Sequence, residues 1–100
     1  MEKIEEKNPG DNGNWTPLHS AAQFGRLKIC KFIMEKIQNK NPVNNLGWTP
    51  LHIAAMMGHL DVCKYIVDIT EDKHPKNIDG HTPLDIAQQN NHIQIVSFLE

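Results

Sequence analysis

The sequence lacks a surplus of one charge, a long apolar run and a basic segment. Its 10 lysines and arginines are balanced by 12 aspartates and glutamates, so the formal net charge of the 100 residues is -2. The two signs are mixed along the chain, which argues against a basic face and a nucleic-acid partner. Apolar runs fall far short of the roughly 18 residues of a membrane span, and residues 1–7 are acidic where a signal peptide would be basic and then apolar. We therefore expect no membrane insertion and a cytoplasmic or nuclear location.

Patterns that carry chemistry are also missing. There is no Cys-x-x-Cys pair, no His-x-x-x-His pair and no glycine-rich phosphate loop after a strand. No serine or cysteine has an identifiable base beside it. We expect no metal, no cofactor and no catalytic residue, so the chain is not predicted to be an enzyme.

Cysteine is scarce, and its two positions are informative. Cys30 and Cys63 are 33 residues apart. Equivalent positions on stacked helices lie roughly 8–10 Å apart, whereas a disulfide needs alpha carbons within about 7 Å. Two reduced, buried thiols are therefore expected, which suits a reducing compartment. Asn14-Trp15-Thr16 matches a glycosylation sequon, but nothing else in the sequence is typical of a secreted protein.

What the sequence does contain is a repeat of 33 residues. Residues 48–55 (WTPLHIAA) match residues 15–22 (WTPLHSAA) and, with changes, residues 81–88 (HTPLDIAQ). Residues 1–4 match residues 34–37 at the same offset. Alignment of the chain on this 33-residue period predicts the end of a preceding unit at 1–7, unit 1 at 8–40, unit 2 at 41–73 and an incomplete unit 3 at 74–100. The sequence is then either a piece of a longer array, which we favour, or a protein with minimal ends.

Each unit has the residue pattern of two successive helices. A Thr-Pro pair can cap and start the first helix, and Gly25, Gly58 or Asn91 tolerates the left-handed conformation that ends it about eight residues later. The second helix has an apolar stripe at helical spacing. That stripe comprises Leu27, Cys30, Ile33, Met34 and Ile37, then Leu60, Cys63, Ile66 and Val67, then Ile93, Val96 and Leu99. Neighbouring units must stack to bury it.

The period, the Thr-Pro-Leu-His and Ala-Ala motifs and the glycine together resemble ankyrin repeats. The resemblance covers essentially the whole chain and implies an all-α ankyrin repeat solenoid of about three helix-turn-helix units joined by β-hairpin-like turns. It also implies protein binding rather than catalysis. In this family the histidine three residues after the threonine is structural. His19 and His52 are therefore expected to form hydrogen bonds with the threonine and with nearby backbone. His59, His74, His81 and His92 are expected to be solvated.

The ankyrin surface that usually contacts partners comprises turn tips, the residue before the threonine and the outer face of the first helix. The slot of Ser20, Ile53 and Ile86 is set aside because it often packs between repeats. Carried over by position, the partner-binding candidates are Trp15, Gln23, Phe24, Asn45, Leu46, Trp48, Met56, Met57, Asp79, His81, Gln89 and Asn90. We call these twelve residues the partner surface.

Aromatic residues and methionine are enriched at binding hot spots, so we expect the strongest contacts at Trp15, Trp48, Phe24, Met56 and Met57. The alternative is that both tryptophans pack across the connectors onto the neighbouring unit. Unit 3 is more polar, as expected for either a terminal repeat or ordinary variation.

The predicted function is a monomeric module that binds a protein partner. Two other readings stay open: a structural spacer in a larger repeat protein, or accessory repeats of a multidomain enzyme. The fold itself does not identify the partner.

Overall fold

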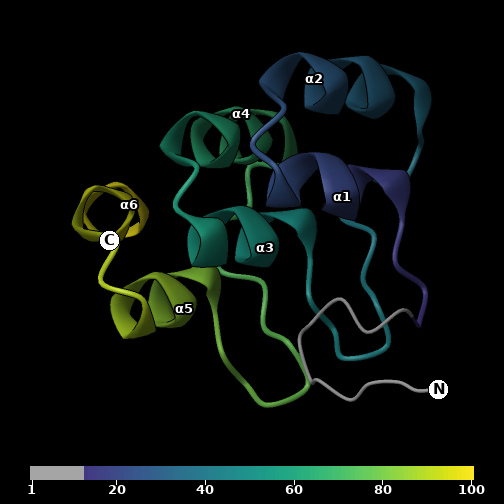
Figure 1. The fold of residues 1–100 in the computed structure, drawn as a ribbon. Coiled ribbons are helices and arrows are strands. Elements are labelled where there is room, and N and C mark those ends of the chain that lie inside the picture. The colour runs from purple at the N-terminus through teal and green to yellow at the C-terminus, as the bar shows by residue number, and fades with distance from the viewer. Residues whose placement is uncertain (1–12) are drawn as a thin grey trace, which may run out of the picture.

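The computed structural model describes residues 13–100, which form six α-helices in three pairs (Figure 1). The helices are α1 (Pro17–Gln23), α2 (Leu27–Lys36), α3 (Pro50–Met57), α4 (Leu60–Thr70), α5 (Pro83–Gln89) and α6 (Ile93–Leu99). Each pair belongs to one predicted unit. The predicted end of a preceding unit at residues 1–7 lies outside the described residues.

The first helix of each unit begins and ends where the repeat predicts. Thr16, Thr49 and Thr82 are extended N-cap residues, each followed by proline at the first helical position. In α3 the chain leaves the helix at Gly58, whose φ is 83°. Asn91 adopts the left-handed conformation in unit 3, with φ 60°, because asparagine tolerates it better than other residues that carry a Cβ.

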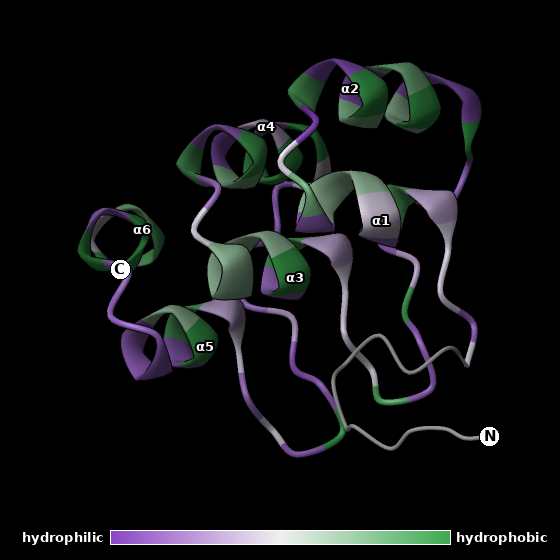
Figure 2. Ribbon diagram, viewed as in Figure 1, coloured by the Kyte–Doolittle hydropathy of each residue, from purple (hydrophilic) through white to green (hydrophobic). Residues whose placement is uncertain are grey.

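The helices form two layers, α1–α3–α5 and α2–α4–α6, with the connecting turns extending to one side (Figure 1). Ala21, Ala54 and Ala87, at equivalent positions of the three first helices, are all buried, and a small side chain there permits close approach of neighbouring helices. Figure 2 shows apolar residues along α3 and hydrophilic residues along most of the turns. The core is continuous across units, as expected for a stacked solenoid.

The second helices follow the predicted stripe, with exceptions. Cys30, Cys63 and Ile66 are fully buried, but Ile93 is 74% exposed although the stripe places it inside. That prediction was wrong for Ile93, and the equivalent Leu27 and Leu60 are half-buried rather than buried. The predicted stripe also left out Val62 and Ile95, which are both buried.

The thiols of Cys30 and Cys63 are free and buried, as predicted. Burial, with a smaller contribution from Asp61, raises the pKa of Cys30 to about 11 and that of Cys63 to about 12. Both groups therefore stay protonated and act as small apolar core residues. None of the helices between residues 13 and 100 has the length and apolar character needed to cross a membrane.

Candidate functional site

His19 and His52 belong to capping boxes, as the sequence predicts. The backbone N–H of His52 donates to the Thr49 hydroxyl at 3.2 Å, and the Thr49 backbone N–H donates to His52 Nδ1 at 3.1 Å. His19 and Thr16 are paired in the same way. Because Nδ1 accepts, Nε2 carries the ring proton. These histidines are scaffold rather than catalytic groups.

The same histidines also join one unit to the next. Nε2 of His19 donates to the carbonyl oxygen of Trp48, and Nε2 of His52 donates to that of His81, both at 2.8 Å. Burial lowers the pKa of both rings, while the bond to the neighbouring carbonyl partly opposes that effect. In unit 3, Asp85 completes the capping box with Thr82, and its pKa is lowered by the backbone N–H of Thr82.

His59 and His92 correct the expectation that they are solvated. Both are half-buried, and each donates from Nε2 to a carbonyl at the end of the preceding unit's first helix: His59 to Gln23 at 3.1 Å and His92 to Met56 at 2.9 Å. A Cβ built on Gly58 would lie 2.8 Å from Cε1 of His92. Glycine is therefore needed at position 58 for space as well as for its positive φ. His74 is exposed as expected, whereas His81 is half-buried.

The two tryptophans are half-buried, and their rings lie against the capping histidines of their own units. The ring centroids of Trp15 and His19 are 4.9 Å apart, and those of Trp48 and His52 are 5.5 Å apart. The Trp15 indole N–H also donates to the Ser20 hydroxyl at 2.7 Å. Each ring is thus partly covered by its own unit and partly accessible to solvent.

The C-terminal ends of the first helices carry the most exposed apolar members of the partner surface. Phe24 is 64% exposed and Met57 is 42% exposed. Gln23 and Met56 are half-buried, whereas Gln89 and Asn90 of unit 3 are exposed. A groove of about 490 Å³ has Trp15, Ser20 and Phe24 in its lining, so it brings two of the predicted hot-spot residues together.

The turn tips form a second part of the partner surface. Asn45, Leu46 and Asp79 are exposed. Successive tips are joined by backbone bonds, since Asn45 N–H donates to the Gly13 carbonyl at 2.8 Å and Ile78 N–H donates to the Leu46 carbonyl at 3.0 Å. The tips are therefore a continuous edge rather than three independent loops.

Sequence reasoning missed the residues that hold the tips of units 2 and 3. The Oδ1 atom of the buried Asn44 accepts the backbone N–H groups of Leu46 and Trp48, each at 2.9 Å. Asn77, in the equivalent slot, accepts those of Asp79 and His81, each at 3.0 Å. The available signal was the 33-residue spacing of the two asparagines together with the tendency of asparagine to bond to backbone two residues ahead.

Residues 13–100 contain no group of three histidine, cysteine or acidic side chains that could hold a metal ion. The arrangement provides three first helices with side-chain caps and turns joined by backbone hydrogen bonds.

These features define a helical repeat solenoid. Residues 13–45 match the ankyrin repeat family, and residues 36–100 match a family described as ankyrin repeats in three copies. The chain therefore belongs to the ankyrin repeat family, whose members are generally protein-binding modules and typically non-catalytic. No curated protein matches the chain significantly.

Proposed function

We propose that this chain recognises a protein partner through the first helices and the turn tips. The observation that carries the proposal is the exposure of Phe24 and Met57 at equivalent positions of adjacent helices, with Leu46 exposed on a neighbouring tip. Exposed apolar side chains that recur on one side of a soluble repeat cost free energy in water unless a partner covers them. Aromatic and methionine side chains are also enriched in the buried centres of interfaces.

The charge distribution supports an apolar partner. The segments 13–25 and 41–58, which contain α1, α3 and their turns, have no charged residue. Arg26, Lys28, Lys31 and Lys36 begin only in the second half of unit 1. Because charged groups are depleted at the centres of interfaces, the uncharged side of units 1 and 2 suits a partner segment with aliphatic or aromatic side chains.

The tryptophans fit the edge of such an interface better than its centre. Trp15 and Trp48 are already packed on His19 and His52, so little rotamer freedom would be lost when a partner contacts them. The same packing makes them poor test positions, because removing either ring would also disturb the fold. Phe24 and Met57 separate binding from folding more cleanly.

The test is a crosslinking pull-down from cell lysate with three forms of the chain. The double variant Phe24→Ala with Met57→Ala removes the most exposed apolar side chains of the partner surface. Ile69→Ala is the matched control, because Ile69 is 39% exposed but lies on α4, in the other layer. A protein captured by the wild type and by the control should not be captured by the double variant. If these residues are hot spots, the double substitution should weaken the binding free energy by more than about 2 kcal/mol. Equal capture by all three forms would remove the proposal.

The proposed role includes no catalytic step. We also propose a cytoplasmic or nuclear location, supported by the two free, buried thiols, since a reducing compartment preserves such groups.

A further inference from the structure

The two tryptophans of the partner surface differ in how their indole N–H groups are used. In unit 1 the indole N–H of Trp15 donates to the Ser20 hydroxyl at 2.7 Å. In unit 2 the slot of Ser20 is occupied by Ile53, whose side chain offers no acceptor. Within residues 13–100 the indole N–H of Trp48 forms no hydrogen bond. Unit 2 therefore has a spare donor where unit 1 has a satisfied one.

This spare donor is accessible to solvent. Among the buried side-chain nitrogen and oxygen atoms of residues 13–100, only Nδ2 of Asn77 lacks a hydrogen-bond partner. The unpaired nitrogen of Trp48 is not among these buried atoms, so an approaching molecule can reach it. Trp48 belongs to unit 2, which has a described unit on either side. Its exposure therefore does not depend on where the sequence begins or ends.

The rest of Trp48 is held in place by its own fold. Its backbone N–H donates to Oδ1 of Asn44 at 2.9 Å, and its carbonyl accepts the Asn44 backbone N–H at 3.1 Å and Nε2 of His19 at 2.8 Å. The indole ring lies against His52. Because the backbone and the ring are already positioned, little conformational freedom would be lost when the indole N–H meets an acceptor.

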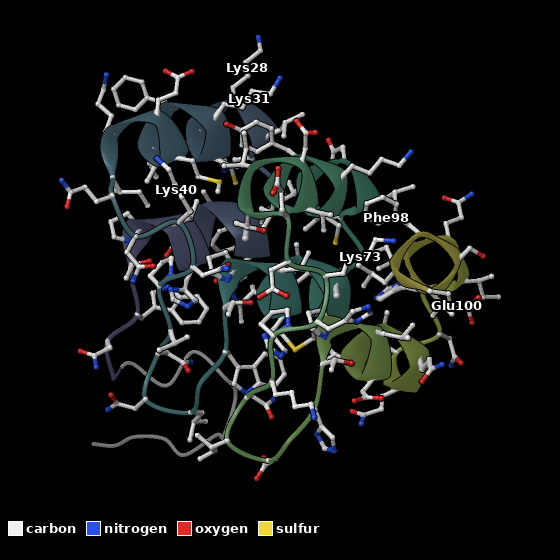
Figure 3. The ribbon with its side chains drawn as sticks, turned by 180° about the vertical axis from the view of Figure 1, so that it is seen from behind. Lys28, Lys31, Lys40, Lys73, Phe98 and Glu100 are labelled. Carbon is white, nitrogen blue, oxygen red and sulfur yellow. The ribbon has the colours of Figure 1, made fainter. Side chains whose placement is uncertain are left out.

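The surroundings of Trp48 favour a neutral acceptor. Segment 41–58 has no charged residue. In the second-helix layer, Lys28 points outward from α2, away from α1 (Figure 3), and Nζ of Lys31 lies over the ring of Tyr65 on α4. A carboxylate brought to Trp48 would lose hydration without a cation to pair with. A backbone carbonyl is uncharged and costs less free energy to bury.

The spacing of the tryptophans indicates the conformation of the segment that supplies this carbonyl. Trp15 and Trp48 hold equivalent positions just before α1 and α3, which pack against each other. Packed helices lie roughly 8–10 Å apart. A polyproline II chain rises about 3.1 Å per residue with three residues per turn, so every third side chain points the same way, about 9 Å apart. Its carbonyls have no internal hydrogen bonds and are free to accept.

Other regular conformations meet only one of these two requirements. In an α-helix all but the last four carbonyls are already bonded within the helix. In a β-strand the carbonyls of an edge are free, but side chains three residues apart point to opposite faces. A polyproline II segment has both free carbonyls and a side-chain spacing that matches neighbouring units.

We propose that the indole N–H of Trp48 donates to a backbone carbonyl of the partner, which binds as an uncharged polyproline II segment. Apolar side chains three residues apart lie against Trp48 and Trp15. The inference rests on the proposed function, because it takes the first helices and turn tips as the binding side. Trp15 contributes only ring surface, since Ser20 already accepts its N–H. Trp48 is the residue that selects the conformation of the partner.

Nuclear magnetic resonance with a short peptide of repeated Leu-Pro-Pro units tests the proposal. The chain has two tryptophans, so it gives two indole N–H resonances, which the single phenylalanine variants assign. The peptide should shift the indole proton of Trp48 downfield and leave that of Trp15 nearly unchanged. A helix-forming peptide of leucine and alanine is the control, and it should produce no such shift.

Paired variants isolate the hydrogen bond. Phenylalanine keeps an aromatic ring against the histidine, and Trp15→Phe removes the same ring area as Trp48→Phe. Trp48→Phe should therefore weaken binding of the Leu-Pro-Pro peptide roughly 3- to 10-fold more than Trp15→Phe, the effect of about one hydrogen bond. Circular dichroism checks that each variant is folded. Benzothienylalanine at position 48, which keeps the double ring without the N–H, provides a second test.

Three results would overturn the inference: an unmoved Trp48 resonance, equal losses in the two phenylalanine variants, or equally tight binding of the helical peptide. The proposed function is judged separately. A captured protein that depends on Phe24 and Met57 but binds Trp48→Phe and Trp15→Phe equally well would keep the proposed function and overturn this inference alone. Equal capture by the wild type and the Phe24 and Met57 double variant would remove the proposed function itself.

Discussion

His52 Nε2 donates a hydrogen bond of 2.8 Å to the backbone carbonyl of His81, 29 residues later in the chain. The same ring accepts the backbone N–H of Thr49 at Nδ1. One fully buried side chain therefore starts α3 and also fixes the turn that leads into α5. The stacking of units thus depends on directional bonds as well as on apolar packing.

Replacement of His52 by alanine should destabilise the fold more than loss of a cap alone. His52→Ala leaves a buried N–H and a carbonyl without their partner, so we expect a loss of about 2–4 kcal/mol in the free energy of unfolding. Asp85→Ala is the matched control, because Asp85 caps α5 in the same way and, within residues 13–100, its side chain hydrogen-bonds to Thr82 of its own unit. It should cost at most about 1 kcal/mol. Urea denaturation of both variants measures the difference, and equal losses would contradict a role between units.

Stability should fall as the solution becomes mildly acidic. Burial lowers the pKa of His19 and His52 from the ordinary value of 6.5. The unfolded chain then binds more protons than the folded chain, so stability is complete above about pH 6.5 and decreases as pH falls below it. In addition, a proton added to Nδ1 would face the threonine backbone N–H from which Nδ1 accepts a hydrogen bond.

Denaturation curves at about pH 7.5 and about pH 5 test this dependence. Replacing His19 and His52 together by asparagine, whose amide does not titrate, should reduce the loss of stability between the two pH values. His74→Gln, which removes an exposed ring, should leave the loss as it is in the wild type. The same pH response in all three proteins would show that the buried rings are not responsible.

The repeat in the sequence predicts those parts of the structure that each unit determines by itself. Thr49 and Pro50 start a helix and Gly58 ends it whatever lies nearby, and these boundaries are confirmed. The bond from His92 to the Met56 carbonyl was not predicted, because it depends on how two units are placed in space. The exposure of Ile93 was missed for the same reason, since the burial of this position depends on contacts between helices.

The partner surface, too, is only partly predictable from the sequence. Its positions follow from the period, but the half-burial of Trp15 and Trp48 comes from ring contacts with histidines that spacing alone does not reveal. The assignment of the twelve residues to partner binding stays a prediction.

Gly58→Ala should be more damaging than Gly80→Ala, although both glycines have a similar positive φ. The values are 83° and 80°, and a Cβ in this conformation costs roughly 1–2 kcal/mol in either case. At Gly58 the new Cβ would also meet the ring of His92 at 2.8 Å, whereas at Gly80 it would meet nothing within 4 Å. Because overpacking adds about 1–3 kcal/mol, we expect a total near 2–5 kcal/mol for Gly58→Ala. Thermal unfolding of both variants provides the comparison, and matching losses would mean that His92 moves aside freely.

Binding of a captured partner should depend little on salt. Segments 13–25 and 41–58 carry no charged residue, so contacts centred on Phe24 and Met57 would release few ions when they form. Surface charge pairs are strongly screened once ionic strength reaches about 1 M, where the Debye length is about 3 Å, whereas apolar burial is not weakened by such screening. Affinity measured from about 0.05 to about 1 M sodium chloride should therefore change by less than about threefold. A fall of a hundredfold or more, in a complex still sensitive to Phe24→Ala, would instead place the main contacts on the charged second helices.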